Sequence, residues 1–247
     1  MKNLLLKVRN KLLNILFNIN FKPRHWVHTI KYSLKDTGMP SDRLIHLVKD
    51  AFDHAIKNNL EHIKKERLNN DHNHIELDEI TTFPGAHYRI LNGLVRAINP
   101  RRVVEIGTWT GVSSLAILDA ARKDDFLLTT FDILPWNNIK HTALLEKDFG
   151  DNFKQILADL SKKNNFDKYH EILCEADLIF IDGPKDGVFE YNLIDSFKKI
   201  NFKNKPIIFF DDINQIEMLN LWASIDKPKF DITSLGQFTG TGLIDWI

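Results

Sequence analysis

The stretch Val103-Val104-Glu105-Ile106-Gly107-Thr108-Trp109-Thr110-Gly111-Val112-Ser113-Ser114, followed by Leu115-Ala116-Ile117-Leu118, decides the fold. Branched apolar residues lead into an acid, a loop with two glycines follows, and the next residues are typical of a helix. The pattern predicts a buried strand that turns directly into a helix, where open α/β sheets bind nucleotide-like ligands. Gly107 and Gly111 permit the backbone to approach such a ligand closely. Glu105 places a carboxylate where sugar hydroxyls or an amino group would meet it.

Strands and helices alternate on both sides of this stretch. Besides the strand at 103–106, strands are predicted at 126–131, 153–157, 177–181, 206–210, 230–235 and 243–247. A helix between Gly85 and Pro100 precedes the first strand, and further helices are predicted at 113–121, 140–147, 166–174, 190–200 and 215–225. This alternation predicts an α/β fold with a doubly wound, mainly parallel seven-stranded sheet and helices on both faces. The last two strands, joined by the turn 236–242, are predicted to be antiparallel neighbours.

Residues 1–75 are predicted to form a helical extension that precedes a domain spanning residues 76–247. Residues 1–35 hold eight Lys or Arg and no acid, and residues 3–19 have apolar side chains at helical spacing. This basic amphipathic helix is expected to pack on the domain or on a second subunit, with contact to an anionic membrane through residues 1–20 as the alternative. A second helix is predicted from Pro40-Ser41-Asp42 to about Asn69, followed by a polar loop at 69–74.

Composition places the chain among ordinary globular proteins, because 43% of its residues are hydrophobic and 27% are charged. The single cysteine, Cys174, excludes an internal disulfide and favours a reducing cytoplasm. No run approaches the ~18 apolar residues that a membrane span requires. Arg9 and Lys11 interrupt the apolar stretch that a cleaved signal peptide would need. Outside residues 1–35 the remaining 25 bases face 33 acids, and this acidic balance disfavours a nucleic-acid partner.

Acids follow several of the predicted strands. Because parallel strands present their carboxyl ends at one edge of a sheet, Asp132, Asp182, Asp211 and Asp212 are expected to gather there. Asp132 is predicted to accept hydrogen bonds from a ribose diol. Asp182, Asp211 and Asp212 are predicted to bind Mg²⁺, Mn²⁺ or Ca²⁺, since three like charges repel unless a cation neutralises them. The alternative is that Asp211 or Asp212 caps the following helix.

Lys185 follows Asp182 by three residues, in the turn Asp182-Gly183-Pro184-Lys185. A lysine beside a metal-bound hydroxyl is predicted to have a lowered pKa and to remove a proton. The alternative is a solvated lysine on an exposed turn.

Four motifs, in this order along the chain, resemble those of class I S-adenosylmethionine-dependent methyltransferases. They are residues 104–113, Phe131-Asp132, residues 180–185 and Asp211-Asp212. The closest likeness is to cation-dependent O-methyltransferases of catechol and caffeoyl type and to their bacterial sugar O-methyltransferase and cephalosporin-hydroxylase-like relatives. The resemblance covers roughly residues 80–247. Asp212 stands where that family has Asn, and Val112 stands where it has Tyr, so a planar catechol is not the only acceptor that the motifs allow.

The resemblance implies an S-adenosyl-L-methionine cofactor, a divalent cation and a small hydroxylated acceptor such as a polyol, a sugar or a catechol-like diol. The implied catalytic residues are Asp182 and Lys185, and the implied metal ligands are Asp182, Asp211 and Asp212. The implied cofactor-binding residues are Glu105, Gly107, Thr108, Gly111, Ser113, Asp132 and Asp159. Within that set, Glu105 is expected at the methionine amino group or its hydrogen-bonding surroundings, and Asp159 at the adenine amine. His87 is expected either to reach the active site or to serve a structural role.

Two other functions stay open on sequence alone. A nucleotide-cofactor oxidoreductase uses the same kind of fold, although Trp109 stands at its middle glycine and the extra acids count against it. The second is a non-catalytic protein that binds membranes or partners through its basic N-terminal helix. Self-association into a homo-oligomer is likewise left open, as is membrane contact of an otherwise cytoplasmic protein.

Overall fold

A computed structural model describes residues 39–68, 80–81 and 85–247. The predictions for the amphipathic helix at 3–19 and for the polar loop at 69–74 lie outside these residues. The predicted domain boundary after residue 75 also falls outside them and stays a prediction.

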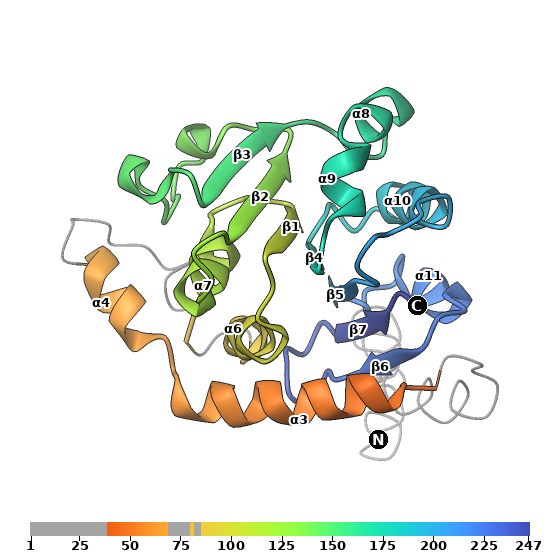
Figure 1. Cartoon of the computed structure of the whole chain (residues 1–247), viewed down its shortest axis with the longest axis horizontal. Coiled ribbons are helices and arrows are strands. Elements are labelled where there is room, and N and C mark those ends of the chain that lie inside the picture. Colours follow the sequence, from red (N-terminus) through yellow and green to blue (C-terminus); the bar gives the residue numbers. More distant parts are fainter. Residues whose placement is uncertain (1–38, 69–79, 82–84) are drawn as a thin grey trace, which may run out of the picture. The chain divides into compact units, whose positions relative to one another are not determined.

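A seven-stranded sheet with the order β3-β2-β1-β4-β5-β7-β6 forms the centre of the fold (Figure 1). Its strands are β1 Arg102–Ile106, β2 Leu127–Asp132, β3 Phe153–Leu157, β4 Leu178–Ile181, β5 Ile207–Asp211, β6 Lys229–Asp231 and β7 Thr241–Asp245. Strands β1 to β5 are parallel, and β7 runs antiparallel to both β5 and β6. The predicted fold class, including the antiparallel C-terminal pair, is confirmed.

The register of the sheet aligns the carboxyl ends of the central strands. Ile106 at the end of β1 lies opposite Phe131 of β2 and Ile181 of β4, and Ile181 in turn lies opposite Phe210 of β5. The residues that follow these positions therefore meet at one edge. This alignment is what brings the loop after β1 and the acids after β2, β4 and β5 together.

Alternate residues of each central strand face opposite layers of helices, as the period of two in a strand requires. Val103 packs with α6 His87–Ile98 and α7 Val112–Ala120 on one face. Val104 packs on the other face, where the helices are α8 Lys163–Lys168, α9 His170–Cys174, α10 Phe189–Phe197 and α11 Leu219–Ser224. Because both faces are covered, β4 is apolar throughout and β5 is apolar up to Asp211, without the alternation of a half-exposed strand.

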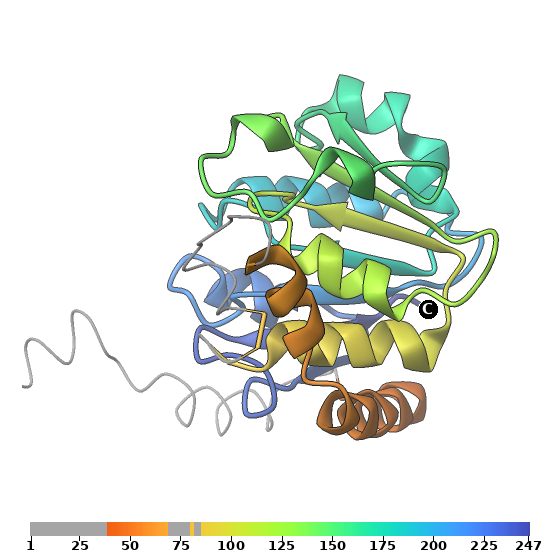
Figure 2. The ribbon, with the colours of Figure 1, turned by 90° about the vertical axis from the view of Figure 1, so that its left-hand side faces the viewer.

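Helix α3 Asp42–Lys57 crosses α6, with Figure 2 showing α3 end-on beneath it. Ser41 caps α3 by accepting a hydrogen bond from the Leu44 N–H at 3.2 Å, and it donates to Asp245 of β7 at 2.7 Å. At the crossing, a Cβ added to Gly93 of α6 would lie 2.1 Å from the Ala51 carbonyl oxygen. Only glycine therefore permits this contact between the two helices.

The single helix predicted up to about Asn69 is wrong, because it is broken into α3 and α4 Glu61–Leu68. Asn58 leaves the helix with extended backbone, and its side-chain oxygen accepts from the Leu60 N–H at 3.2 Å. Leu60 then takes a left-handed conformation with φ of 61°. A local side-chain bond thus replaces the next helical turn.

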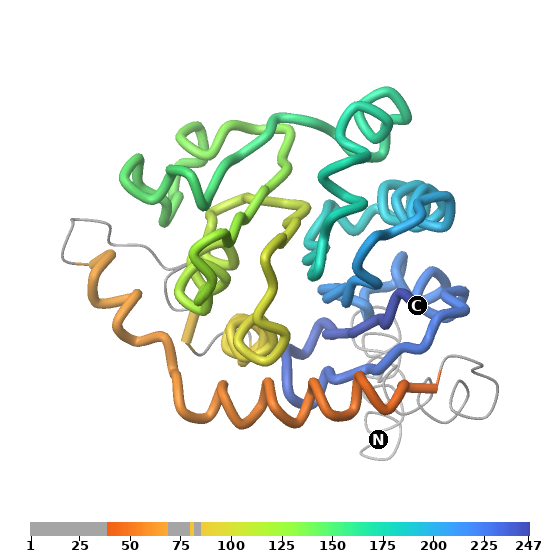
Figure 3. Tube along the Cα trace, in the orientation of Figure 1, coloured from red at the N-terminus to blue at the C-terminus, as the bar shows by residue number. Residues whose placement is uncertain are grey.

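The helix predicted at 140–147 is also wrong. The chain between β2 and β3 is irregular in Figure 3 and holds only the 3₁₀ turns η1 Trp136–Asn138 and η2 Glu146–Asp148. Ala143 instead donates its N–H to the Thr110 carbonyl at 2.8 Å, and the Leu144 side chain packs on Gly111. Contacts with the distant loop after β1 outweigh the local helical pattern.

Three further predicted elements have different limits. The helix predicted at 166–174 is two helices, which meet at Tyr169. The helix predicted at 215–225 begins only at Leu219. The strand predicted at 230–235 ends at Asp231, whose side chain accepts from the Thr233 N–H at 2.9 Å and so starts a turn. Among the described residues, no helix is long and apolar enough to cross a bilayer.

Candidate active site

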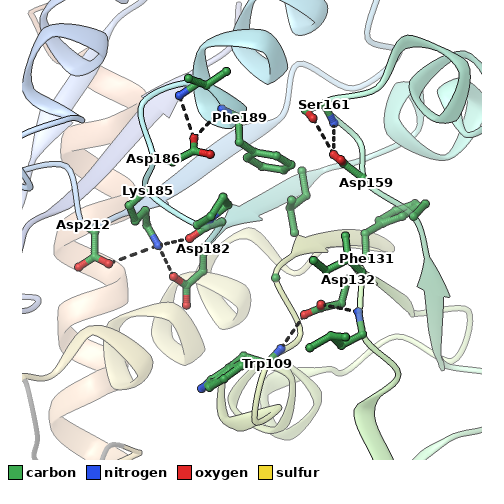
Figure 4. A pocket seen from close by; sticks show the side chains of 18 of the residues that line it. Trp109, Phe131, Asp132, Asp159, Ser161, Asp182, Lys185, Asp186, Phe189 and Asp212 are labelled. Carbon is green, nitrogen blue, oxygen red and sulfur yellow. Dashed lines mark hydrogen bonds and ion pairs between the residues drawn. The ribbon is translucent and has the colours of Figure 1, made fainter. Parts of the chain in front are cut away.

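A cavity of about 700 Å³ opens at the carboxyl ends of the parallel strands. Its size is that of a small-molecule site. The loops after β1, β2, β3, β4 and β5 all contribute to its walls, and Figure 4 shows their side chains converging on it. The walls that these loops contribute include Gly107, Trp109, Asp132, Ile133, Leu134, Ala158, Asp159, Ser161, Asp182, Gly183, Lys185, Asp212 and Gln215.

The loop between β1 and α7 is fixed by Asp132. Its Oδ2 accepts hydrogen bonds from the Thr108 and Trp109 N–H groups at 2.9 and 3.0 Å, while Oδ1 accepts from the Leu134 N–H at 2.9 Å. Gly107 has φ of 101°, and a Cβ there would lie 2.1 Å from the Asp182 carbonyl oxygen. The glycine therefore permits the loop after β1 to contact the end of β4, where Asp182 lies.

Glu105 lies beneath this loop instead of in the cavity wall. It is fully buried, and its Oε2 accepts a hydrogen bond from the Ser114 hydroxyl in the first turn of α7. Its Oε1 has no partner. Burial raises the pKa of Glu105 to about 7, although the hydrogen bond from Ser114 and the nearby hydroxyls of Ser113 and Thr130 act in the opposite direction. Of its two predicted positions, the structure favours the hydrogen-bonding surroundings over direct contact.

The predicted cofactor residues thus divide into two groups. Gly107, Asp132 and Asp159 line the cavity. The remaining four are buried and are not part of the wall: Glu105, Thr108, Gly111 and Ser113.

The carboxylate of Asp159, after β3, contacts both Ser161 and Lys162. Its Oδ1 accepts from the Ser161 N–H at 3.0 Å and from the Ser161 hydroxyl at 2.6 Å, and its Oδ2 lies 3.5 Å from the Lys162 Nζ. Burial raises the pKa of Asp159, but the bonds from Ser161 and the charge of Lys162 outweigh burial and hold the pKa below its usual value. A negative charge therefore remains on this wall of the cavity.

The three predicted metal ligands come together. Asp182, Asp211 and Asp212 each offer a carboxylate oxygen, and these oxygens lie within 4.8 Å of one another. Burial raises the pKa of Asp211 well above its usual value, and the charges of Asp182 and Asp212 add to the rise. Helix α11 begins at Leu219 with no side-chain hydrogen bond at its N-cap, so neither Asp211 nor Asp212 caps it.

Lys185 is the cation of this cluster. It is only 8% exposed, and its Nζ lies 2.5 Å from Asp182 Oδ1 and 3.3 Å from Asp212 Oδ2. Burial lowers the pKa of Lys185, but the charges of Asp182, Asp212 and Asp211 outweigh burial and raise it above its usual value. The lowering predicted for a lysine beside a metal-bound hydroxyl stays a prediction, whereas the alternative of a solvated turn lysine is wrong because Lys185 is buried.

The cluster suits a divalent cation on two observations. Three carboxylate oxygens are the hard donors that Mg²⁺, Mn²⁺ and Ca²⁺ prefer. The Lys185 ammonium already bridges two of these acids and so stands in for a metal charge.

Two buried groups at the site were not predicted. Glu190 of α10 is fully buried, and its Oε1 accepts a hydrogen bond from the Lys185 N–H at 2.8 Å. Gln237, in the loop between β6 and β7, donates its Nε2 to Asp211 Oδ1 at 2.5 Å and to Asp212 Oδ1 at 3.3 Å. Neither residue belongs to a motif of the sequence, and their burial follows from contacts between distant segments.

His87, at the start of α6, is 2% exposed and does not line the cavity. Burial lowers its pKa to about 4, while the nearby charge of Asp182 raises it and that of Lys185 lowers it. Its Nδ1 has no hydrogen-bond partner. The side chain is therefore neutral at physiological pH, and it contacts the Tyr88 ring at 3.8 Å between centroids.

Comparison with known families gives the same domain. The family model described as a methyltransferase domain matches residues 104–213, from within β1 to just beyond β5. The matched residues include cavity walls on both sides, from Gly107 on the first loop to Asp212 after β5.

A curated relative of this chain is Probable caffeoyl-CoA O-methyltransferase 3 of Dictyostelium discoideum, which is 27% identical over 165 residues. The matched region is 62% of this chain and 60% of the relative, so the chain spans about three fifths of the relative's length. Among solved structures, the SAH-bound methyltransferase PaMTH1 of Podospora anserina is 16% identical with a TM-score of 0.48, covering 92% of this chain and 97% of that one. The O-methyltransferase of Bacillus cereus in complex with SAH is 14% identical with a TM-score of 0.49, covering 75% and 90%.

Proposed function

We propose that this chain is an S-adenosylmethionine-dependent, divalent-metal-assisted O-methyltransferase that acts on a small hydroxylated acceptor. One observation carries the proposal: the loop held by Asp132 and the acids paired with Lys185 border the same cavity. A methyl donor and an activated hydroxyl must meet in one place for transfer to occur. The match of residues 104–213 to the methyltransferase domain family supports the same class of reaction.

The half of the cavity formed after β1, β2 and β3 would bind the cofactor. Asp132 lies in its wall, where its carboxylate would accept the ribose hydroxyls. Asp159 would accept the adenine amine, since a charged carboxylate is a good acceptor for an N–H group. Trp109 and Ile133 are 63% and 70% exposed, and these apolar surfaces would cover the nucleoside.

The half formed after β4 and β5 would bind the cation and the acceptor. Asp182, Asp211 and Asp212 would hold the ion, which acts as a Lewis acid that lowers the pKa of a bound hydroxyl. Lys185 keeps its proton while Asp182 and Asp212 flank it, so it holds positive charge beside the acceptor oxygen. Proton acceptance by Lys185 would require these acids to have another partner.

The acceptor is proposed to be a polyol, a sugar or a catechol-like diol, because each presents paired oxygens to a cation. The Dictyostelium discoideum relative is named as a probable caffeoyl-CoA O-methyltransferase, which supports oxygen as the methylated atom.

Calorimetry and an activity assay test the proposal. The wild-type protein is expected to bind S-adenosylmethionine and not NAD, and to methylate a hydroxylated acceptor only when a divalent cation is present. Asp182→Ala is expected to abolish this metal-dependent turnover while leaving cofactor affinity within about threefold, because Asp182 lies at the acid cluster. Unchanged turnover in excess chelator would reject the metal role, and binding of NAD alone would favour the oxidoreductase.

Contact of residues 1–20 with an anionic membrane, self-association and a cytoplasmic location stay predictions. Loss of liposome binding on deletion of residues 1–20, without any methyl transfer by the full chain, would favour the non-catalytic alternative.

A further inference from the structure

Gln237 places a neutral amide inside the acid cluster. Its side chain is buried, with 5% of the residue exposed, and its Nε2 lies 2.5 Å from Asp211 Oδ1 and 3.3 Å from Asp212 Oδ1. The amide nitrogen therefore contacts two of the three carboxylates of the cluster.

The backbone on both sides of Gln237 is fixed. Gly85 forms an antiparallel bridge with Gln237, and the Ala86 N–H donates to the Gly236 carbonyl at 2.8 Å. On the other side, the Gly240 N–H donates to the Gln237 carbonyl at 3.0 Å. A Cβ added to Gly85 would lie 2.2 Å from the Gly236 oxygen, so these segments are in direct contact. The loop that carries the Gln237 amide is therefore held in place by contacts with the residues at the start of α6.

The two ends of an amide group have nearly the same shape, and a half-turn exchanges the nitrogen and the oxygen. Without a metal, the NH₂ end must face Asp211 and Asp212, because carboxylates only accept. With a cation among these acids, the NH₂ end would face positive charge, and the oxygen would be the favoured end. Ligand oxygens of an octahedral Mg²⁺ at about 2.1 Å lie about 3 Å apart. The distances from the Gln237 Nε2 to Asp211 Oδ1 and to Asp212 Oδ1, 2.5 and 3.3 Å, lie on either side of this spacing.

We infer that Gln237 is a fourth protein ligand of the divalent-cation site. When a cation binds, Gln237 would turn its amide so that Oε1 becomes a ligand together with Asp182, Asp211 and Asp212. The inference rests on the proposed metal site and adds a residue that none of its motifs contains. A neutral amide adds a donor oxygen to the site without adding negative charge to a cluster that already holds three carboxylates and one ammonium.

Titration with Mn²⁺ alone, followed by the electron paramagnetic resonance of the free ion, tests the inference. Gln237→Leu and Gln237→Asn are expected to weaken Mn²⁺ binding at least tenfold, since one side chain lacks an amide and the other is too short to reach. Gln237→Glu, which keeps an oxygen at the same position, is expected to bind Mn²⁺ as tightly as the wild type or more tightly. Gln215→Leu removes another amide of the cavity wall and is expected to leave Mn²⁺ affinity within about twofold.

The outcomes separate this inference from the proposed function. If the wild type binds Mn²⁺ and the Gln237→Leu and Gln237→Asn variants bind it equally tightly, the role of Gln237 is overturned and the proposed metal site is retained. If Gln237→Glu weakens Mn²⁺ binding as much as Gln237→Leu does, the role of Gln237 as a ligand is also overturned. A residue that acts through folding alone would show this result, because its effect does not depend on the donor atom. A wild-type protein that binds no Mn²⁺ would overturn both. Circular dichroism confirms that each variant is folded before titration.

Discussion

Replacement of Lys185 by methionine is expected to tighten the binding of a divalent cation. The Lys185 Nζ lies 2.5 Å from Asp182 Oδ1 and 3.3 Å from Asp212 Oδ2, so any ion that binds these acids meets its positive charge. A divalent ion about 5 Å from a unit charge is repelled by roughly 3 kcal/mol at an effective dielectric constant of about 40. The flexible ammonium can turn away and relieve part of this repulsion. A gain of about 1.4 to 2.8 kcal/mol is expected, which is a 10- to 100-fold lower Kd.

The assay is calorimetric titration of the folded variants with Mn²⁺, without cofactor or acceptor. Lys185→Arg keeps the charge and is expected to bind Mn²⁺ as the wild type does. Lys203→Met removes a lysine that pairs with Glu175 far from the acids, and its Mn²⁺ affinity is expected to stay within about twofold. Turnover by Lys185→Met at saturating Mn²⁺ is expected to fall at least 100-fold, so that affinity and activity change in opposite directions. A Mn²⁺ affinity equal to or weaker than that of the wild type would refute the assignment of Lys185 as the competing cation.

Three further predictions concern buried groups. Glu190→Leu removes the acceptor of the Lys185 N–H and is expected to lower kcat at least tenfold, whereas Glu190→Gln, which keeps an acceptor oxygen, should stay within about threefold in the same assay. Because the pKa of Glu105 is about 7 in the fold against an ordinary 4.5, its contribution to stability is present below pH 4.5 and is lost as the pH rises through 7. Urea unfolding should therefore show the wild type losing about 3 kcal/mol relative to Glu105→Gln between pH 4.5 and 8, and a constant difference would contradict this. Gly93→Ala forces a Cβ to 2.1 Å from a backbone oxygen of α3 and should lower Tm by about 3–10 °C, while Gly150→Ala, whose nearest neighbour is 4.0 Å away, should leave Tm unchanged.

The sheet could be predicted because each of its parallel strands is recognisable from the residues of that strand alone. Each buried parallel strand is a short run of branched or aromatic apolar residues, and several such runs end in an acid, as at Asp132 and Asp182. Since parallel strands share one carboxyl edge, the sequence positions of these acids were enough to predict their gathering. The irregular segment at 139–145 was not predictable in this way, because Ala143 and Leu144 follow contacts with the loop after β1.

The detailed contacts of the site depend on distances between side chains that cannot be read from a sequence motif. Lys185 was correctly expected over the acids, but the direction of its pKa depends on the separation of Nζ from Asp182 and Asp212. Glu190 was assigned to a helix, and only the start of α10 beneath the turn makes it a buried acceptor. Gln237 reaches the acids because β7 pairs with β5, a contact between segments far apart in the chain.

Strand β7 follows β6 in the chain but lies between β5 and β6 in the sheet. Until β7 has emerged from the ribosome, β5 is an edge strand, and Asp211 lacks both its neighbour Thr241 and the amide of Gln237. The strands β1, β2 and β3, with the first loop and Asp132, come much earlier in synthesis. The loops that line one half of the cavity are therefore synthesised well before the acid cluster of the other half is complete. For the proposed methyltransferase, the part that would bind the methyl donor is made before the part that would activate the acceptor.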